Sequence, residues 1–109
     1  MCGIAGALAL RDGARVDRER LCAMAGLMGH RGPDGEGFWT EPRGRVAFAH
    51  RRLSVIDIAG GRQPMCSDDG RIALVFNGEI YNYRELRRAL SDQGVRFHTA
   101  SDTEVLLRL

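Results

Sequence analysis

The sequence predicts a small domain of the α+β class, and three observations carry that prediction. "RIALVF" at residues 71–76 and several shorter runs are bounded by turns rich in Gly, Pro and Asp, a pattern typical of strands. Residues 17–29 repeat apolar side chains at helical spacing. Asn-x-x-Glu at residues 82–85 and Ser-x-x-Glu at residues 101–104 match the capping box that begins a helix. The chain has 109 residues, which is enough for one domain with a modest core.

The first half of the chain is expected to form a strand, a helix and a pair of neighbouring strands. Residues 3–10 form a buried, glycine-containing strand that ends before an Asp-Gly turn at residues 12–13. "HRGPDGEG" at residues 30–37 is a loop, because it is too rich in Gly and Pro for a regular element. Residues 37–40 and 46–50 form strands joined by the turn "EPRG". Between them, a helix from Asp17 to about Gly29 turns four apolar side chains toward the core, namely Leu21, Met24, Ala25 and Met28.

The second half is expected to contain two strands and two helices. Residues 51–65 continue the preceding strand and then become a long loop. The Asp69-Gly70 turn leads into the strand at residues 71–76, and a helix at residues 82–93 ends at Gly94. "VRFHT" at residues 95–99 forms a short strand before the last helix, which is still apolar at Leu109. An unfinished helix of that length is marginal in water, so we expect this chain to be the front part of a larger protein.

Charge and cysteine usage exclude several classes of protein. The formal net charge is only +2 and the basic residues form no block, so we expect no nucleic-acid or membrane partner. Cys2, Cys22 and Cys66 are odd in number, lie far apart and form no C-x-x-C pair, which argues against a disulfide framework and against a metal site. Free thiols are typical of a reducing compartment, so the expected location is cytoplasmic. "MCGIAGALAL" is too short for a signal peptide or a membrane span.

Cys2 directly follows the initiator methionine, and two interpretations are open for it. It can serve as a small apolar residue at the start of the first strand. Once methionine is removed, however, thiol and α-amine belong to one residue, and an α-amine with a pKa of about 7.7–8.0 can take the thiol proton. Such a cysteine would be a nucleophile that attacks an acyl carbon and releases ammonia or an amine.

Asn77 and Gly78 follow the strand at residues 71–76. The Asn77 side-chain NH2 and the Gly78 backbone N–H are candidate donors for the oxyanion that acyl transfer creates. The alternative is that Asn-Gly forms a hairpin turn, which is its commonest use.

Three charged residues suit an amino-acid substrate. Arg52 stands at the end of a strand, and its planar fork can pair with a carboxylate. Asp102 and Glu79 are candidates for an ammonium group. Asp102 is equally interpretable as an acid stabilised in the first turn of a helix, and Glu79 as an ordinary surface acid.

Six segments, taken together and in order, resemble the glutamine amidotransferase domain of class II and lie closest to its asparagine synthetase branch. They are "MCGIAG", "HRGPDG", "HRRLSVID", "GRQPM", "FNGEIYNYRELR" and "SDTEVLL", and the resemblance extends from Cys2 to Leu109. It implies an N-terminal-nucleophile (Ntn) hydrolase fold, in which two antiparallel sheets stack between helical layers, and residues 1–109 would be only the front part of that domain. "HRGPDG" receives no chemical role, and His30, His50 and His98 match no catalytic position.

The resemblance also implies roles for individual residues. Cys2 would be the nucleophile, and Asn77 with Gly78 would form the oxyanion hole. Glu79 and Asp102 would take the α-amino group of L-glutamine. Its carboxylate would be held by Arg52 with the four residues that follow it, Leu53, Ser54, Val55 and Ile56.

The family continues into a C-terminal synthetase domain that uses ATP and Mg²⁺ to activate aspartate, and no pyrophosphate-binding loop occurs in these residues. We therefore expect no cofactor in this segment, the synthetase domain as its partner in the full-length chain, and a homodimer as a candidate assembly. The predicted reaction is glutamine hydrolysis that supplies ammonia for asparagine synthesis. Three alternatives remain open: an amidotransferase with a sugar-phosphate or cell-surface-polymer acceptor, a non-catalytic glutamine-binding module, and an inactive fragment.

Overall fold

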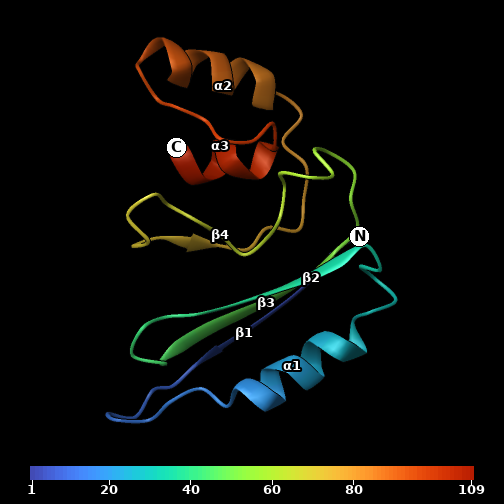
Figure 1. Ribbon diagram of the computed structural model, residues 1–109, viewed down its shortest axis with the longest axis vertical. Coiled ribbons are helices and arrows are strands. Elements are labelled where there is room, and N and C mark those ends of the chain that lie inside the picture. The colour runs from blue at the N-terminus through green and yellow to red at the C-terminus, as the bar shows by residue number, and fades with distance from the viewer.

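Three helices and five strands make up the computed structural model, which describes all residues from 1 to 109 (Figure 1). The predicted α+β class is confirmed, because every strand pairing is antiparallel and the helices lie outside the sheets. In chain order the elements are β1 (Gly3–Leu8), α1 (Arg18–Leu27), β2 (Gly35–Thr40), β3 (Val46–Arg52), β4 (Met65–Cys66), β5 (Ala73–Leu74), α2 (Tyr83–Asp92) and α3 (Asp102–Arg108).

The larger sheet has the strand order β1-β3-β2, with β3 in the centre. Side chains alternate between the two faces of a strand, so Ala47 and Ala49 of β3 point to the same side. Leu21 and Ala25 of α1 pack on these alanines and form the buried core with them. The small alanine side chains let the helix lie close to the sheet. α1 therefore covers one face of this sheet, as Figure 1 shows below it.

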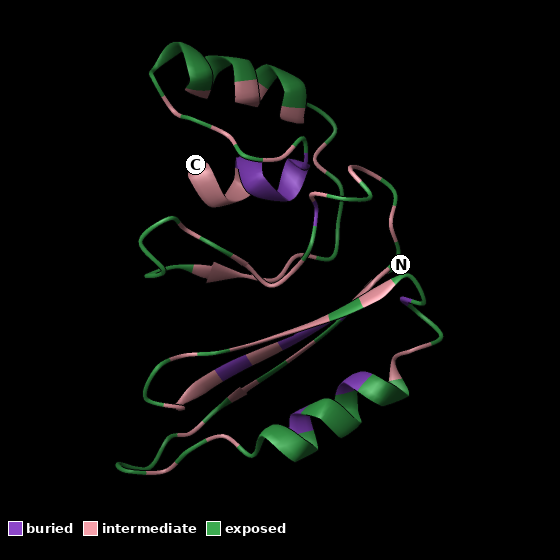
Figure 2. Ribbon diagram, in the orientation of Figure 1, coloured by how far each residue is buried: buried purple, intermediate pink, exposed green.

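The second half of the chain lies on the other side of that sheet. β4 and β5 form a two-stranded ladder, α3 packs against β4, and α2 packs against α3. The layers in Figure 1 thus follow the order helix, three-stranded sheet, two-stranded sheet, helices. Figure 2 places most buried residues in β3, on one side of α1 and in the first turn of α3, where residues 101–105 are all buried.

The elements of the first half match their predicted positions with three corrections. β1 ends at Leu8 rather than at residue 10 and is not buried as predicted, because it is an edge strand and its face away from α1 leaves Ile4 45% and Leu8 60% exposed. β2 begins at residue 35 rather than residue 37, because pairing with β3 continues to Arg52 and draws the end of the Gly-rich loop into the ladder. Met24, predicted to be in the core, is 48% exposed. Only one residue per helical turn of α1 reaches the alanines of β3, and these positions are occupied by Leu21 and Ala25.

The predicted strand at residues 71–76 shrinks to Ala73–Leu74, and β4, which was not predicted, is its only partner. The ladder stops where Val75 would face Pro64, which has no N–H to donate, and the Phe76 backbone N–H then donates to the Gln63 side chain at 2.6 Å. The helix predicted at residues 82–93 forms and is followed by Gly94 at φ +90°, but Asn82 makes no side-chain capping bond. The Asn82 capping box was therefore a wrong prediction for a correctly placed helix.

The predicted strand "VRFHT" does not form, because Glu104 takes its backbone donors. The Glu104 carboxylate accepts hydrogen bonds from the His98 N–H (2.9 Å) and the Thr99 N–H (2.7 Å). Burial alone would raise the pKa of Glu104, but these bonds outweigh it and hold the pKa below its usual value. Ser101 caps α3 as predicted by accepting from the Thr103 N–H, whereas Glu104 is diverted from the reciprocal half of the capping box.

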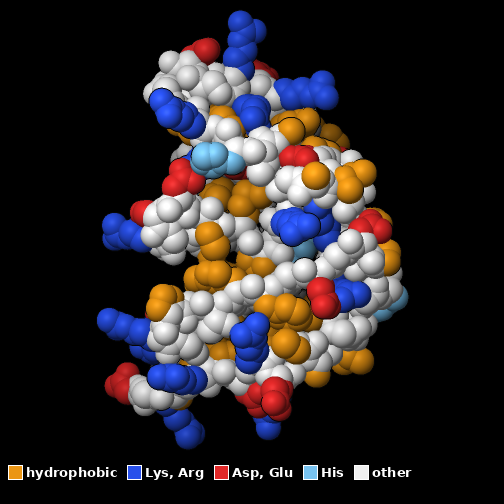
Figure 3. All heavy atoms as spheres, viewed as in Figure 1, with side chains coloured by type: hydrophobic (Ala, Val, Ile, Leu, Met, Phe, Trp, Pro, Cys, Tyr) orange, Lys and Arg blue, Asp and Glu red, His pale blue; other side chains and the backbone are white.

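Figure 3 shows hydrophobic side chains between the two halves of the molecule, while acidic and basic side chains are scattered over both halves of this face. None of the three helices is both long enough and apolar enough to cross a membrane.

Candidate active site

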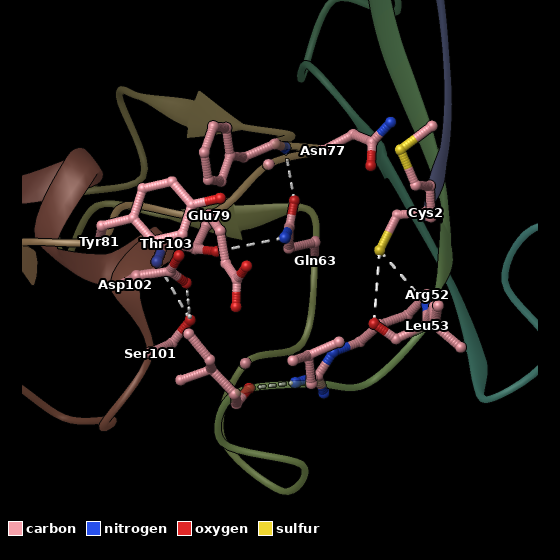
Figure 4. Close-up of a pocket in the computed structure, with 16 residues that line it drawn as sticks. Cys2, Arg52, Leu53, Gln63, Asn77, Glu79, Tyr81, Ser101, Asp102 and Thr103 are labelled. Atoms are coloured by element: carbon pink, nitrogen blue, oxygen red, sulfur yellow. Dashed lines mark hydrogen bonds between the residues drawn. The ribbon is translucent and has the colours of Figure 1, made fainter.

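A pocket of about 330 Å³ lies where the start of β1, the end of β3 and the N-terminus of α3 meet (Figure 4). It brings together all but one of the residues predicted for the site. These are Cys2, Arg52, Leu53, Val55, Ile56, Asn77, Gly78, Glu79 and Asp102.

The exception is Ser54, which does not line this pocket. Its backbone N–H donates to the Asp34 carboxylate at 2.7 Å, and it lines a separate, mostly polar pocket instead. Of residues 52–56, Ser54 alone does not line the first pocket, and Arg52 lines both pockets.

Cys2 is placed at the pocket by the register of the sheet. Gly3 pairs with Arg51, so the residue before β1 lies beside the residues that end and follow β3. The Leu53 backbone N–H donates to the Cys2 Sγ at 3.3 Å, and the thiol lies 3.5 Å from the Leu53 carbonyl (Figure 4). These two backbone contacts hold the Cys2 side chain in one orientation at the pocket.

Arg52 organises the loop that follows β3. Its guanidinium donates to the backbone carbonyls of Ile56 (3.0 Å), Asp57 (2.6 Å) and Ile58 (2.8 Å). Glycine at position 61 leaves room for this approach, because an added Cβ there would crowd Arg52 Nη2 and the Asp57 carbonyl. Arginine has five N–H donors, and these bonds use three of them. The Nε–H and one Nη1–H remain for a ligand.

Asn77, Gly78 and Glu79 form an exposed segment on the pocket wall rather than a hairpin turn. The two-residue hairpin typical of Asn-Gly needs positive φ at both residues, and neither Asn77 nor Gly78 has it. The hairpin interpretation is therefore wrong. The side chain and backbone N–H of this pair are left without strand partners beside the pocket.

Asp102 lies across the pocket from Cys2, together with Glu79 (Figure 4). Asp102 is only 5% exposed, and its Oδ2 accepts a hydrogen bond from the Ile80 backbone N–H at 3.0 Å. Neither acid forms an ion pair with Arg or His. A buried carboxylate without a cationic partner is costly, so this wall of the pocket is suited to a ligand ammonium group.

Sequence reasoning missed several residues that line the pocket. Gln63 was quoted only as part of the "GRQPM" segment, and no chemical role was predicted for it. The others are Met1, Gly61, Phe76, Tyr81, Ser101 and Thr103. Most of these residues lie within two positions of a predicted site residue, so their place in the motifs could have suggested them. Gly61 and Gln63 reach the pocket only through tertiary contacts, so no local pattern identifies them.

His50 supplies a pH-dependent contribution to stability beside the site. It is 1% exposed, and burial, together with the nearby Arg52 charge, lowers the pKa of His50 below 6.5. The unfolded chain therefore binds a proton before the folded protein does. The contribution of neutral His50 is fully present above pH 6.5 and is lost as the pH falls through the lowered folded-state pKa.

We expect the free energy of unfolding to fall on acidification by up to about 1.4 kcal/mol per pH unit through this one group. Urea unfolding from neutral pH to about pH 5 measures the effect, which adds to the proton-linked contributions of the other titrating groups. His50→Gln removes the titration and should give a shallower decline. Equal slopes in the two proteins would contradict this prediction.

Comparison with known proteins identifies related sequences. The family described as "Glutamine amidotransferase domain" matches residues 1–109. Asparagine synthetase [glutamine-hydrolyzing] 1 of Bacillus subtilis (strain 168) is 45% identical over 109 residues, which cover 98% of this chain and 17% of the relative. Asparagine synthetase [glutamine-hydrolyzing] 1 of Arabidopsis thaliana is 41% identical over 109 residues, covering 100% of this chain and 18% of the relative. The chain thus spans less than a fifth of the length of these relatives.

Proposed function

The chain belongs to the glutamine amidotransferase domain family, and we propose that it hydrolyses L-glutamine to glutamate and ammonia through a γ-glutamyl thioester on Cys2. The observation that supports this most directly is the position of the Cys2 sulfur. It lies in the same pocket as two unpaired carboxylates, a guanidinium with free donors and an Asn-Gly segment without strand partners.

The reaction proceeds in two halves. After removal of Met1, the α-amine of Cys2 takes the thiol proton, and the sulfur attacks the side-chain amide carbon of glutamine. The Asn77 NH2 and the Gly78 N–H stabilise the resulting oxyanion. The C–N bond then breaks, and ammonia leaves with the proton that the α-ammonium returns. Water next attacks the thioester, releasing glutamate and restoring the thiol.

Charge complementarity orients the substrate. Arg52 takes the α-carboxylate through its two remaining N–H donors, while Asp102 and Glu79 take the α-ammonium on the same carbon. Leu53, Val55 and Ile56 supply apolar lining for the methylene groups of the glutamine side chain.

The family and the layer order support an Ntn hydrolase fold, of which this chain is the front part. We further propose that the ammonia serves asparagine synthesis from aspartate, because both relatives described above are named asparagine synthetases. No group of three His, Cys, Asp or Glu side chains is placed to hold a metal ion in this chain. ATP and Mg²⁺ would belong to a C-terminal synthetase domain, and this chain joined to that domain is the complete protein. The complete protein would act in the cytoplasm.

Asp102→Asn tests the proposed function in the complete protein. Asn keeps an acceptor for the Ile80 N–H but loses the charge that would hold the substrate ammonium. Glutamine binding should weaken by about 1–3 kcal/mol, the scale of a charged hydrogen bond, and this should appear mainly as a raised KM for ammonia release from L-glutamine.

Asp92→Asn is the matched control, because Asp92 is an exposed acid at the end of α2, away from the pocket. Its KM should stay at the wild-type value. An unchanged KM in the Asp102 variant would remove this residue from the substrate site. No ammonia release by the wild-type complete protein would refute the proposed function itself.

A further inference from the structure

The Gln63 side chain connects two walls of the pocket. Its Oε1 accepts a hydrogen bond from the Phe76 backbone N–H at 2.6 Å, and its Nε2 donates to the Thr103 Oγ1 at 3.3 Å (Figure 4). A primary amide is a donor and an acceptor at once, so one side chain can make both bonds. Gln63 is half-buried and lines the pocket itself.

Both partners of Gln63 are immediate neighbours of proposed site residues. Phe76 precedes Asn77 and Gly78, the proposed oxyanion donors, and Thr103 follows Asp102. Of residues 75–79, only Phe76 donates a backbone N–H to any hydrogen bond, and Gln63 accepts it. The placement of Asn77 and Gly78, the oxyanion segment, therefore depends on Gln63, since β5 has already ended at Leu74.

The backbone of Gln63 is fixed to the sheet that carries the nucleophile. An added Cβ at Gly37 of β2 would overlap the Gln63 carbonyl and crowd Pro64, so the segment lies directly on the strand. Gly37 pairs with His50 of β3, and β3 leads into Leu53, which holds the Cys2 sulfur. The Gln63 backbone thus lies on the sheet that carries Cys2, and its side chain reaches the oxyanion segment on the other wall of the pocket.

We propose that Gln63 is a positioning residue for glutamine hydrolysis, which sets the Asn77–Gly78 oxyanion donors at their working distance from the Cys2 sulfur. This inference rests on the proposed function. Oxyanion donors act only when they lie about 2.7–3.1 Å from the developing charge, and a shift of about 1 Å can cost on the order of a hundred-fold in rate. Loosening the segment should therefore lower kcat while glutamine, held by its α-groups, still binds.

Gln63→Leu in the complete protein removes both hydrogen bonds with little change in size. We expect kcat for glutamine hydrolysis to fall at least about ten-fold, with KM changed by less than about three-fold. Gln63→Glu keeps an acceptor for the Phe76 N–H, and the Thr103 hydroxyl can donate to its other oxygen. This conservative variant should restore kcat to within a few-fold of wild type.

Gln93→Leu is the matched control, because Gln93 is the other glutamine of the chain, is exposed and follows α2 away from the pocket. Alkylation of Cys2 by iodoacetamide, measured on the Cys2-containing peptide by mass spectrometry, should proceed at the same rate in all variants because this reaction needs no oxyanion hole.

Thr103→Val covers the case in which Gln63→Leu does not fold. It removes one of the two bonds, and a kcat reduced a few-fold at constant KM is expected.

A wild-type kcat in folded Gln63→Leu, or in Thr103→Val where the Leu variant does not fold, would overturn the inference. So would an effect on KM alone, which would make Gln63 a wall of the binding site. These outcomes are distinct from a failure of the proposed function, in which the wild-type protein and the Gln93 control would also release no ammonia from glutamine.

Discussion

Cys2→Ser in the complete protein should lose glutamine hydrolysis by at least about a hundred-fold, while activity driven by added ammonia survives. A hydroxyl holds its proton far more tightly than a thiol, so the α-amine can no longer generate a useful nucleophile. The Leu53 N–H, which lies 3.3 Å from the sulfur, can still donate to the serine oxygen, so the loss reflects the chemistry of the atom rather than its placement.

The chain provides two matched controls for this substitution. Cys22 lies on α1 and Cys66 on β4, and both are exposed and outside the pocket. Cys22→Ser and Cys66→Ser should therefore hydrolyse glutamine at the wild-type rate. Glutamine hydrolysis near wild type in Cys2→Ser would show that the nucleophile assignment is wrong. Loss of the ammonia-driven activity as well would point to a folding defect instead.

Local sequence patterns predict the elements of this domain better than they predict the partners of those elements. The helix at α2 forms where expected although Asn82 caps nothing, because its end at Gly94 and the packing of α2 on α3 are sufficient. "VRFHT" has strand-forming composition, yet Glu104 satisfies its backbone donors from within the next helix. Strand propensity states a local preference only, and a buried carboxylate nearby can override it.

The residues predicted for the site, Ser54 excepted, lie on one pocket, and the sheet register places Cys2 there beside the end of β3. Each motif alone is a weak signal, and these residues were predicted from six segments taken together and in order. Ser54 lines the neighbouring pocket instead, and a run of consecutive residues in a motif does not by itself show which of them reach one pocket. Gln63 was missed because its importance lies in two hydrogen bonds to residues 13 and 40 positions away.

Retention of a single residue ahead of Cys2 should abolish glutamine hydrolysis without unfolding the protein. A peptide bond to Met1 converts the α-amine of Cys2 into an amide, which has no basic lone pair and cannot accept the thiol proton. Met1 also lines the same pocket as Cys2, so a retained residue occupies space beside the sulfur where glutamine must approach.

A removable N-terminal extension, with a protease site that leaves Cys2 as the first residue, tests this within one sample. The extended protein should show ammonia-driven activity but no glutamine hydrolysis, and cleavage should restore the latter. Mass spectrometry of the active form should then find Cys2 at the N-terminus. The same extension at the C-terminus of the complete protein is the control and should be harmless. Full glutamine hydrolysis by a sample that demonstrably retains residues before Cys2 would refute the mechanism. In that event the thiol would work without its own α-amine, and another base would have to take its proton.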